Sequence, residues 1–234
     1  MLVELYTSQG CSSCPAADAF VAALPSLGLP RERVVPLAFH VDYWNGLGWR
    51  DPFSSPEFTA RQQRYADSGV LRSPNGKAGL TGLYTPQMIV DGTTHFPGGR
   101  REIALAEIRR AGASPPALEL AASAAANGDR AVVTLRTSPR PAAAGDEWQA
   151  RVALAARATR TEVPRGENGG RTLEEAAVVR VLSPPSPVQP GGPLVTITVT
   201  KPRDLPWSDV ELVVFVQSPR TLRVAAAAKV PVGP

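Results

Sequence analysis

The chain has 234 residues, of which 43% are hydrophobic and 20% charged, and its formal net charge is +4. This balance is typical of a globular protein with a substantial core, and it excludes an intrinsically disordered chain. The apolar runs are shorter than the ~20 residues of a membrane-spanning helix. Because the basic residues form no stripe with interleaved aromatic residues, we expect no nucleic-acid binding, and we expect no membrane insertion either.

The first part of the chain alternates strand-like and helix-like segments. Their order predicts β-α-β-α-β-β-α, with a parallel strand pair, an antiparallel hairpin and a last helix. The expected strands are 2–8, 33–41, 87–92 and 94–99, and the expected helices are 15–24, 55–68 and 100–112. The last helix ends at Gly112, and Pro115 and Pro116 prevent its continuation. A domain boundary near Ser114 follows.

The second part, residues 115–234, consists of short β-prone runs between turn residues. The sequence Asn127-Gly128-Asp129 joins two of them as a hairpin. The expected strands are 117–124, 130–137, 148–157, 176–182, 194–200, 210–217 and 221–230. This pattern predicts an antiparallel β-sandwich. We therefore expect two domains, residues 1–114 and 115–234.

Both cysteines of the chain, Cys11 and Cys14, lie between the first strand and the first helix. A disulfide between them would close a very small loop, so it would stabilise the fold little. A helix N-terminus, in contrast, favours a thiolate. We expect Cys11, at the N-cap and more exposed, to be the nucleophile, and Cys14 to be the resolving thiol.

A metal site is the alternative use of these cysteines. Zinc sites usually have four ligands, and the chain offers only two cysteines and two histidines, His40 and His95. His40 ends a strand at the same sheet edge, so Cys11, Cys14 and His40 form an alternative soft-metal site for Cu(I). His40 is otherwise expected to be a hydrogen-bonded histidine at a strand end.

The segment "YTPQMIVDG" (84–92) places a proline immediately before a strand. Such a bond is one of the few that adopt the cis form. A cis Thr85-Pro86 bond would turn Thr85 toward an incoming peptide or the neighbouring disulfide. We include Thr85 and Pro86 in the catalytic site and expect Tyr84 to contact substrate.

The loop "HVDYWNGLGWRDPF" (40–53) is rich in acidic, aromatic and glycine residues. Loops of this kind at a sheet edge often line a site. Asp42 is our candidate proton acceptor for Cys14, and Trp44 a candidate wall for substrate, together with Ser12 and Ser13. A packed Ω-loop that only covers the sheet edge is the alternative.

The segment "RGENGGRTL" (165–173) lacks the order of a phosphate-binding loop, so we expect a turn between two strands. We also hypothesise that its charged residues Glu167 and Arg171 brace the first part of the chain.

The layout of strand, C-x-x-C, helix, strand, helix, Thr-Pro and hairpin resembles the thioredoxin fold over residues 1–112. The motifs "VELYTSQGCSSCPAAD", "LAFHVDYWNGLGWRDPFSSPEFTARQQRYA", "YTPQMIVDG" and "RGENGGRTLEEAAVVRVL" are similar to those of domain of unknown function family 1223 (DUF1223). The resemblance implies an α/β thioredoxin-like domain followed by an antiparallel β-sandwich-like domain, in a periplasmic or secreted bacterial protein. The chain opens without a signal-peptide pattern, so a cytoplasmic location also stays open.

The leading hypothesis is a thiol-disulfide oxidoreductase that acts on protein or peptide thiols through a redox-active Cys11-Cys14 disulfide, with no other cofactor. The alternatives are a copper-binding or copper-delivery protein and a partner-binding protein with a non-catalytic redox pair. The sequence predicts no oligomeric state.

Overall fold

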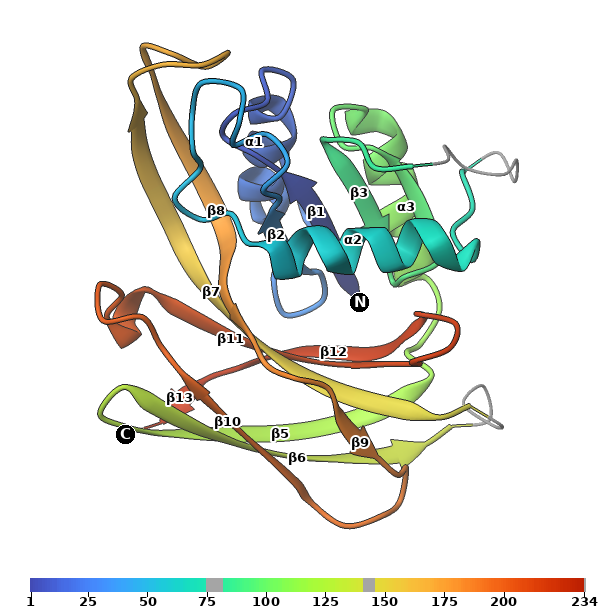
Figure 1. The fold of residues 1–234 in the computed structure, drawn as a ribbon. Coiled ribbons are helices and arrows are strands. Elements are labelled where there is room, and N and C mark those ends of the chain that lie inside the picture. The colour runs from blue at the N-terminus through green and yellow to red at the C-terminus, as the bar shows by residue number, and fades with distance from the viewer. Residues whose placement is uncertain (75–81, 141–145, 234) are drawn as a thin grey trace.

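A computed structural model describes residues 1–74, 82–140 and 146–233 of the chain (Figure 1). Within these residues the chain forms three α-helices and thirteen β-strands. The helices are α1 (Pro15–Ala23), α2 (Pro56–Ser68) and α3 (Arg101–Gly112). The strands are β1 (Leu2–Thr7), β2 (Val35–His40), β3 (Gln87–Val90), β4 (Thr94–Pro97), β5 (Leu118–Asn127), β6 (Arg130–Pro139), β7 (Trp148–Val163), β8 (Arg171–Leu182), β9 (Ser186–Val188), β10 (Val195–Thr200), β11 (Val210–Gln217), β12 (Val224–Val230) and β13 (Val232–Gly233).

One mixed sheet of nine strands runs through both parts of the chain. Its order is β12-β11-β7-β8-β2-β1-β3-β4, and β9 pairs with β7. The expected fold class, a thioredoxin-like domain followed by a sandwich-like domain, is therefore wrong. The molecule is mostly β-structure, and the strands of the first part do not form a sheet of their own. The β-rich second part agrees with the expectation for residues 115–234.

The two parts join where β8 lies parallel to β2, with Ala38 opposite Val178. The strands β7 and β8 form a long hairpin, of 16 and 12 residues, that extends past this junction to the loop before α1 (Figure 1). The two strands that join the parts are about 140 residues apart in the sequence, and no local sequence pattern indicates that they pair. Whether residues 1–114 fold independently stays a prediction.

The helices and the second sheet cover the large sheet on both faces. The small sheet, β10-β6-β5-β13, packs its alternating apolar side chains against β7, β11 and β12. The helix α2 packs Phe58 and Tyr65 on the strands of both parts, including Phe39 of β2 and Phe215 of β11. The helices α1 and α3 contribute Phe20 and Ile108 to a third apolar cluster. The carboxyl ends of β1 and β2 are thereby held side by side.

A buried polar network also connects the two parts. Glu4 of β1 accepts hydrogen bonds from the Arg61 guanidinium, at 2.7 Å, and from the Tyr65 hydroxyl, at 2.6 Å. Arg61 donates a further bond to Gln217 of β11, at 3.1 Å. Because Glu4 and Arg61 are both buried, each ion depends on the other for compensation of its lost hydration.

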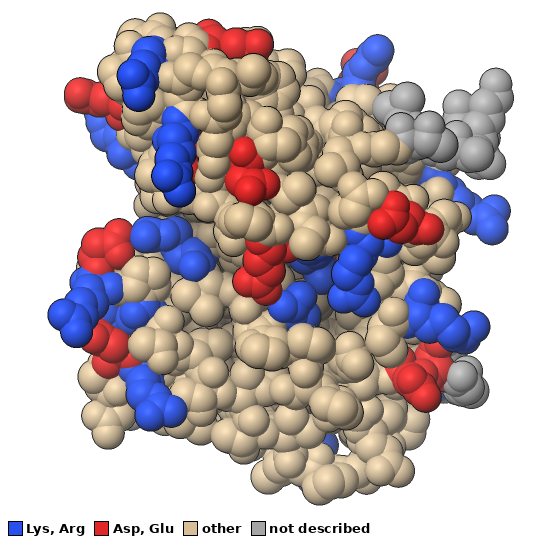
Figure 2. Space-filling model, viewed as in Figure 1, with Lys and Arg blue, Asp and Glu red and all other residues tan. Residues whose placement is uncertain are grey.

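The surface carries charges of both signs, interspersed over the face shown in Figure 2. Among the described residues, no helix is long and apolar enough to cross a membrane.

Candidate functional site

A disulfide joins Cys11 and Cys14 in the loop between β1 and α1, with their Cα atoms 5.5 Å apart. Tight turns shape this loop: the Cys11 amide donates to the Ser8 carbonyl, and the Cys14 amide to the Cys11 carbonyl. Because Pro15 is the first residue of α1, the N-cap is Cys14 and not Cys11. Both cysteines have 0% exposed surface, so the expectation of a more exposed Cys11 is wrong.

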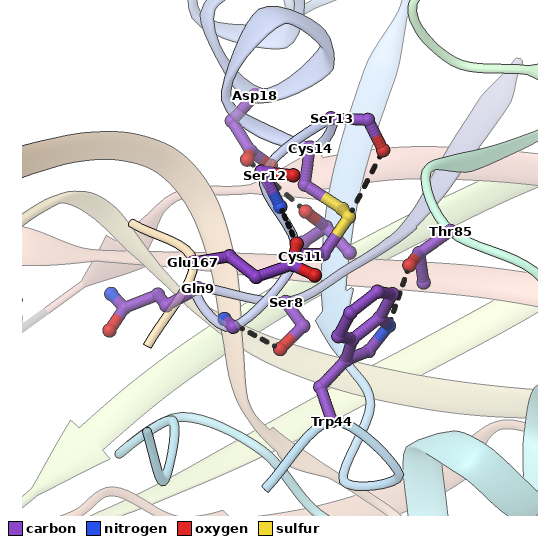
Figure 3. Close-up of a disulfide and its surroundings, with 12 residues drawn as sticks. Ser8, Gln9, Cys11, Ser12, Ser13, Cys14, Asp18, Trp44, Thr85 and Glu167 are labelled. Atoms are coloured by element: carbon purple, nitrogen blue, oxygen red, sulfur yellow. Dashed lines mark hydrogen bonds between the residues drawn. A yellow bond between two sulfur atoms is a disulfide. The ribbon is translucent and has the colours of Figure 1, made fainter. Parts of the chain in front are cut away.

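The two serines between the cysteines are exposed, in contrast to the cysteines themselves. The Ser13 hydroxyl lies 3.3 Å from Cys11 Sγ (Figure 3). A hydroxyl at this distance can donate to a thiolate, which favours the ionised form of Cys11 after reduction.

The Thr85-Pro86 bond is cis, as expected from the sequence. Thr85 Oγ1 accepts a hydrogen bond of 2.8 Å from the Trp44 indole, and Figure 3 shows both side chains on the same side of the disulfide. A Cβ atom at Gly10, next to Cys11, would lie 3.1 Å from Trp44 Cβ. The glycine therefore lets the loop that carries Trp44 pack directly against the disulfide loop.

The side chains of two other candidate site residues, Asp42 and Tyr84, form hydrogen bonds away from the disulfide. Asp42 Oδ1 accepts a hydrogen bond of 2.5 Å from Thr59 of α2. The Tyr84 hydroxyl lies 2.9 Å from Nδ1 of His95 in β4. The structure thus gathers Cys11, Cys14, Thr85, Pro86 and Trp44 around the disulfide loop, while Asp42 and Tyr84 bond to neighbouring elements; their roles stay predictions.

The carboxyl group nearest to Cys14 along α1 is Asp18, one helical turn further on. Residues four apart share a helix face, and Figure 3 shows both residues at the start of α1. Asp18 is buried, its Oδ2 accepts a bond of 3.1 Å from the Thr7 hydroxyl, and Oδ1 has no partner among the described residues. Burial raises the pKa of Asp18 to about 7. The group therefore exchanges a proton near neutral pH.

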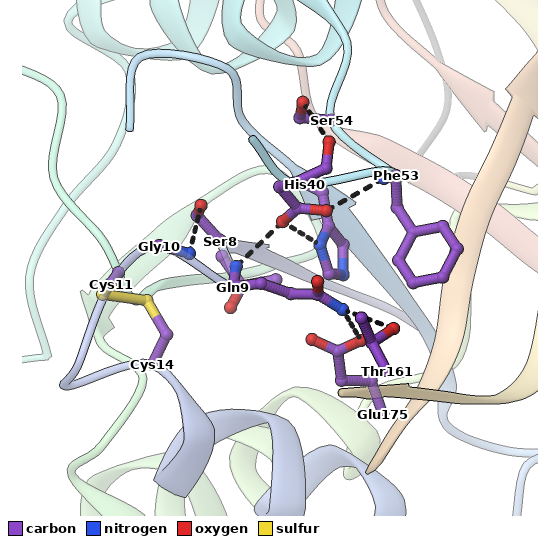
Figure 4. A network of polar contacts seen from close by, with 12 residues as sticks. Ser8, Gln9, Gly10, Cys11, Cys14, His40, Phe53, Ser54, Thr161 and Glu175 are labelled. Carbon is purple, nitrogen blue, oxygen red and sulfur yellow. Dashed lines mark hydrogen bonds and ion pairs between the residues drawn. A yellow bond between two sulfur atoms is a disulfide. The ribbon is translucent and has the colours of Figure 1, made fainter. Parts of the chain in front are cut away.

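Beside the disulfide loop lies a buried cluster of charged groups (Figure 4). His40, at the end of β2, holds Asp51 through a bond of 2.7 Å between Nδ1 and Oδ2. Gln9 donates its amide to Asp51 and its side chain to Glu175 of β8, both at 2.8 Å. The cluster thereby connects the disulfide loop with β2 and with the long hairpin of the second part.

The electrostatics of this cluster follow from burial and from the pairing of opposite charges. Burial alone would lower the pKa of His40, but the charge and hydrogen bond of Asp51, with Glu175 and Asp18 nearby, raise it to about 9. Burial likewise opposes ionisation of Asp51, yet His40 and two backbone amides lower the pKa of that carboxyl. His40 is thus a cation at neutral pH, and its positive charge favours ionisation of Asp18.

His40 was also the third residue of the alternative copper site. The interpretation of a hydrogen-bonded histidine at a strand end is confirmed by its bond to Asp51. No group of three or more His, Cys, Asp or Glu side chains within residues 1–74, 82–140 and 146–233 is arranged to hold a metal ion. Copper binding to the reduced thiols stays a prediction.

The turn between β7 and β8 reaches the disulfide loop, as hypothesised for Glu167. The Glu167 carboxylate accepts a bond of 2.9 Å from the Ser12 amide. The side chain of Asn168 donates to the carbonyls of Gln9 and Cys11, at 2.9 and 3.0 Å. Arg171 contributes indirectly, because it donates to the Asn168 side-chain oxygen. The second part of the chain therefore supports the disulfide loop of the first.

Sequence reasoning missed Asp18, Asp51 and Asn168. Asp18 had a local signal, since it is the one acidic residue of a helix otherwise made of Pro, Ala, Phe and Val. Asp51 and Asn168 had none, because their partners lie on segments that only the folded chain brings together.

The comparisons with known proteins agree with the fold but do not name an activity. No curated protein matches the chain. Among solved structures, a structural-genomics target protein of Agrobacterium tumefaciens shares 24% identity and a TM-score of 0.68, with 97% of this chain and 92% of that chain covered. HBP35 of Porphyromonas gingivalis shares 16% identity and a TM-score of 0.68, with 97% of this chain and 73% of that chain covered.

These likenesses show the fold alone, whereas the match to a family model shows the family. The model described as "Protein of unknown function (DUF1223)" matches residues 2–217, which include both cysteines, the cis-proline segment and the β7–β8 turn. The chain therefore belongs to the DUF1223 family.

Proposed function

We propose that the protein is a thiol-disulfide oxidoreductase that exchanges disulfides with protein or peptide thiols. The observation that carries the proposal is the Cys11-Cys14 disulfide at the start of α1, with the buried carboxyl group of Asp18 one turn away. A disulfide that closes so small a loop contributes little to stability. A helix N-terminus with a proton acceptor close by serves thiol chemistry instead.

The exchange has two steps when the dithiol reduces a substrate disulfide. The Cys11 thiolate attacks one substrate sulfur, forms a mixed disulfide and releases the other substrate sulfur as a thiolate. Cys14 then transfers its proton to the Asp18 carboxylate and attacks Cys11 Sγ, which re-forms the Cys11-Cys14 bond and releases the second substrate thiolate. Two electrons pass from the protein to the substrate, and water protonates the released thiolates. Oxidation of a substrate dithiol runs through the same steps in reverse.

The burial of both cysteines adds a requirement to this reaction. A sulfur nucleophile must approach Cys11 along the disulfide axis, and neither cysteine has exposed surface in the oxidised protein. The residues around the disulfide, among them the exposed Ser12 and Ser13, must therefore move locally before a substrate reacts. We expect small thiols to react faster with the oxidised protein than folded protein substrates do.

Catalysed turnover of a peptide disulfide, with glutathione as the electron source, tests the proposal. We expect turnover by the natural chain and none by the Cys11→Ser variant. Ser26→Ala, an exposed change just beyond α1, is the matched control and should retain the rate. A natural chain that leaves the peptide disulfide at the uncatalysed rate would refute the function.

We also propose an extracytoplasmic location, which the family resemblance implied. An intramolecular disulfide persists more readily in an oxidising compartment than in the cytosol. Fractionation of cells that express the natural gene tests this, and recovery of the protein only with the cytosol would contradict it.

A further inference from the structure

We infer that Glu167, in the turn between β7 and β8, is a positioning residue that makes the dithiol a stronger reductant by destabilising the Cys11 thiolate. The inference rests on the proposed function and assigns a redox role to the second part of the chain. It starts from one contact, the bond of 2.9 Å between the Ser12 amide and the Glu167 carboxylate (Figure 3).

The position of this carboxylate is fixed by the turn around it. Asn168 is fully buried and donates to two carbonyls of the disulfide loop, those of Gln9 and Cys11. A Cβ atom at Gly166 would lie 3.0 Å from Trp49 Cβ, so the turn also packs closely on the loop that follows β2. Because the neighbouring residues Gly166 and Asn168 are fixed by these contacts, the Glu167 side chain points to Ser12 although it is exposed.

The carboxylate acts on Cys11 in two ways. First, the Ser12 amide belongs to the peptide group that follows Cys11, and its hydrogen bond to Glu167 removes a donor from the surroundings of the thiolate. Second, covalent geometry places the carboxylate within about 8 Å of Cys11 Sγ, which is about one Debye length at physiological salt. The bond to the Ser12 amide lowers the pKa of Glu167, so the group is a full negative charge at neutral pH.

A negative charge at this distance opposes ionisation of the Cys11 thiol. A less stable thiolate shifts the equilibrium from the dithiol toward the disulfide, and the protein then gives up electrons more readily. Arg165 also lies on this turn, and its side chain makes no hydrogen bond or ion pair with the described residues, whereas Arg171, at the start of β8, donates to the side-chain oxygen of Asn168. Arg171 thus reaches the Cys11 carbonyl only through Asn168, whereas Glu167 binds the amide next to Cys11 directly. We therefore expect the negative charge of Glu167 to determine whether ionisation of the Cys11 thiol is favoured or opposed.

Equilibration of the protein with reduced and oxidised glutathione tests the inference. In that reaction the protein disulfide and two glutathione thiols give the protein dithiol and one glutathione disulfide. At a pH above the thiol pKa of Cys11, where the reduced protein carries the thiolate, we expect Glu167→Gln to favour the dithiol by roughly threefold at low salt, the size of an interaction between exposed charges. That change is about 14 mV for a two-electron couple. Glu167→Lys should shift the equilibrium further in the same direction.

The matched control is Glu162→Gln, an exposed change on β7 of the same hairpin, which should leave the equilibrium unchanged. The effect of Glu167→Gln should also fall toward zero in 1 M salt, where the Debye length is about 3 Å. The thiol pKa of Cys11, measured from the pH dependence of alkylation, should fall by about half a unit in Glu167→Gln.

The inference would be overturned if Glu167→Gln leaves the glutathione equilibrium and the thiol pKa of Cys11 unchanged. A shift of either quantity in the opposite direction would also overturn it. This outcome is distinct from failure of the proposed function. The glutathione equilibrium and the thiol pKa are measurable even in a protein that exchanges disulfides with no peptide, and peptide turnover by the natural chain does not depend on the sign of the Glu167 effect.

Discussion

Replacement of Asp18 by asparagine changes the charge of the buried acid but keeps its size. The asparagine oxygen retains the bond that Oδ2 accepts from the Thr7 hydroxyl. Burial moves the pKa of Asp18 from 3.8 to about 7, a difference of about 3 units. Each unit corresponds to about 1.4 kcal/mol, so the ionised carboxylate lowers the free energy of unfolding by about 4 kcal/mol at high pH.

The sign of this effect follows from the two protonation equilibria. In the unfolded chain Asp18 loses its proton near pH 4, whereas in the folded chain it keeps the proton up to about pH 7. Between these values the folded state binds more protons than the unfolded state, so its stability falls as pH rises. Asp18→Asn has no such proton, and its advantage over the natural chain should grow across this window.

Urea unfolding of the disulfide form between pH 4 and pH 9 measures the difference. We expect the natural chain and Asp18→Asn to be about equally stable at pH 4 and the variant to be about 4 kcal/mol more stable at pH 9. Asp67→Asn, on the exposed face of α2, is the control and should show no such trend. A stability difference between Asp18→Asn and the natural chain that is constant from pH 4 to pH 9 would refute the reasoning.

Three further predictions concern the surroundings of this acid and the metal alternative. His40→Gln removes a cation that lowers the pKa of Asp18, so the carboxyl titration seen by carbon NMR should move above pH 7, and an unmoved midpoint would exclude this coupling. Arg61→Met leaves Glu4 buried without its cation and should lower the free energy of unfolding in urea by about 3–5 kcal/mol; a loss below about 1 kcal/mol would contradict the account. The copper hypothesis predicts one Cu(I) bound per reduced chain, lost on changing either cysteine and weakened by His40→Ala, and competition with a coloured chelator that shows no binding would dismiss it.

Local patterns predicted most of the individual elements, although β7 and β8 are longer than expected and β9 and β13 were missed. The helix expected over 15–24 is observed as Pro15–Ala23, because Pro15 suits a first helical position and the apolar spacing continues to the end of the segment. The hairpin at Gly128 is observed between β5 and β6, where the glycine adopts a φ of 59°. Such features depend on a few neighbouring residues, so the sequence displays them directly.

The pairing of strands that are distant in the sequence could not be predicted from local patterns. The contact of β8 with β2 determines the single large sheet, yet each strand alone looks like an ordinary buried strand. The same holds for the site. The C-x-x-C and Thr85-Pro86 motifs are recognisable in the sequence. The burial of Cys11, in contrast, depends on which loops fold over it, and the sequence does not show that. Asp51 and Asn168 matter only because the fold brings them to the disulfide loop.

Mass spectrometry of the Cys14→Ser variant tests the central claim most directly. Without the resolving thiol, a mixed disulfide formed at Cys11 should persist after incubation with a peptide disulfide. The account predicts one peptide adduct per chain, located on Cys11 and released by a reductant, and no adduct on the Cys11→Ser, Cys14→Ser double variant. A Cys14→Ser protein that is folded, carries a free Cys11 thiol and still forms no adduct would contradict thiol-disulfide exchange as the function of this site.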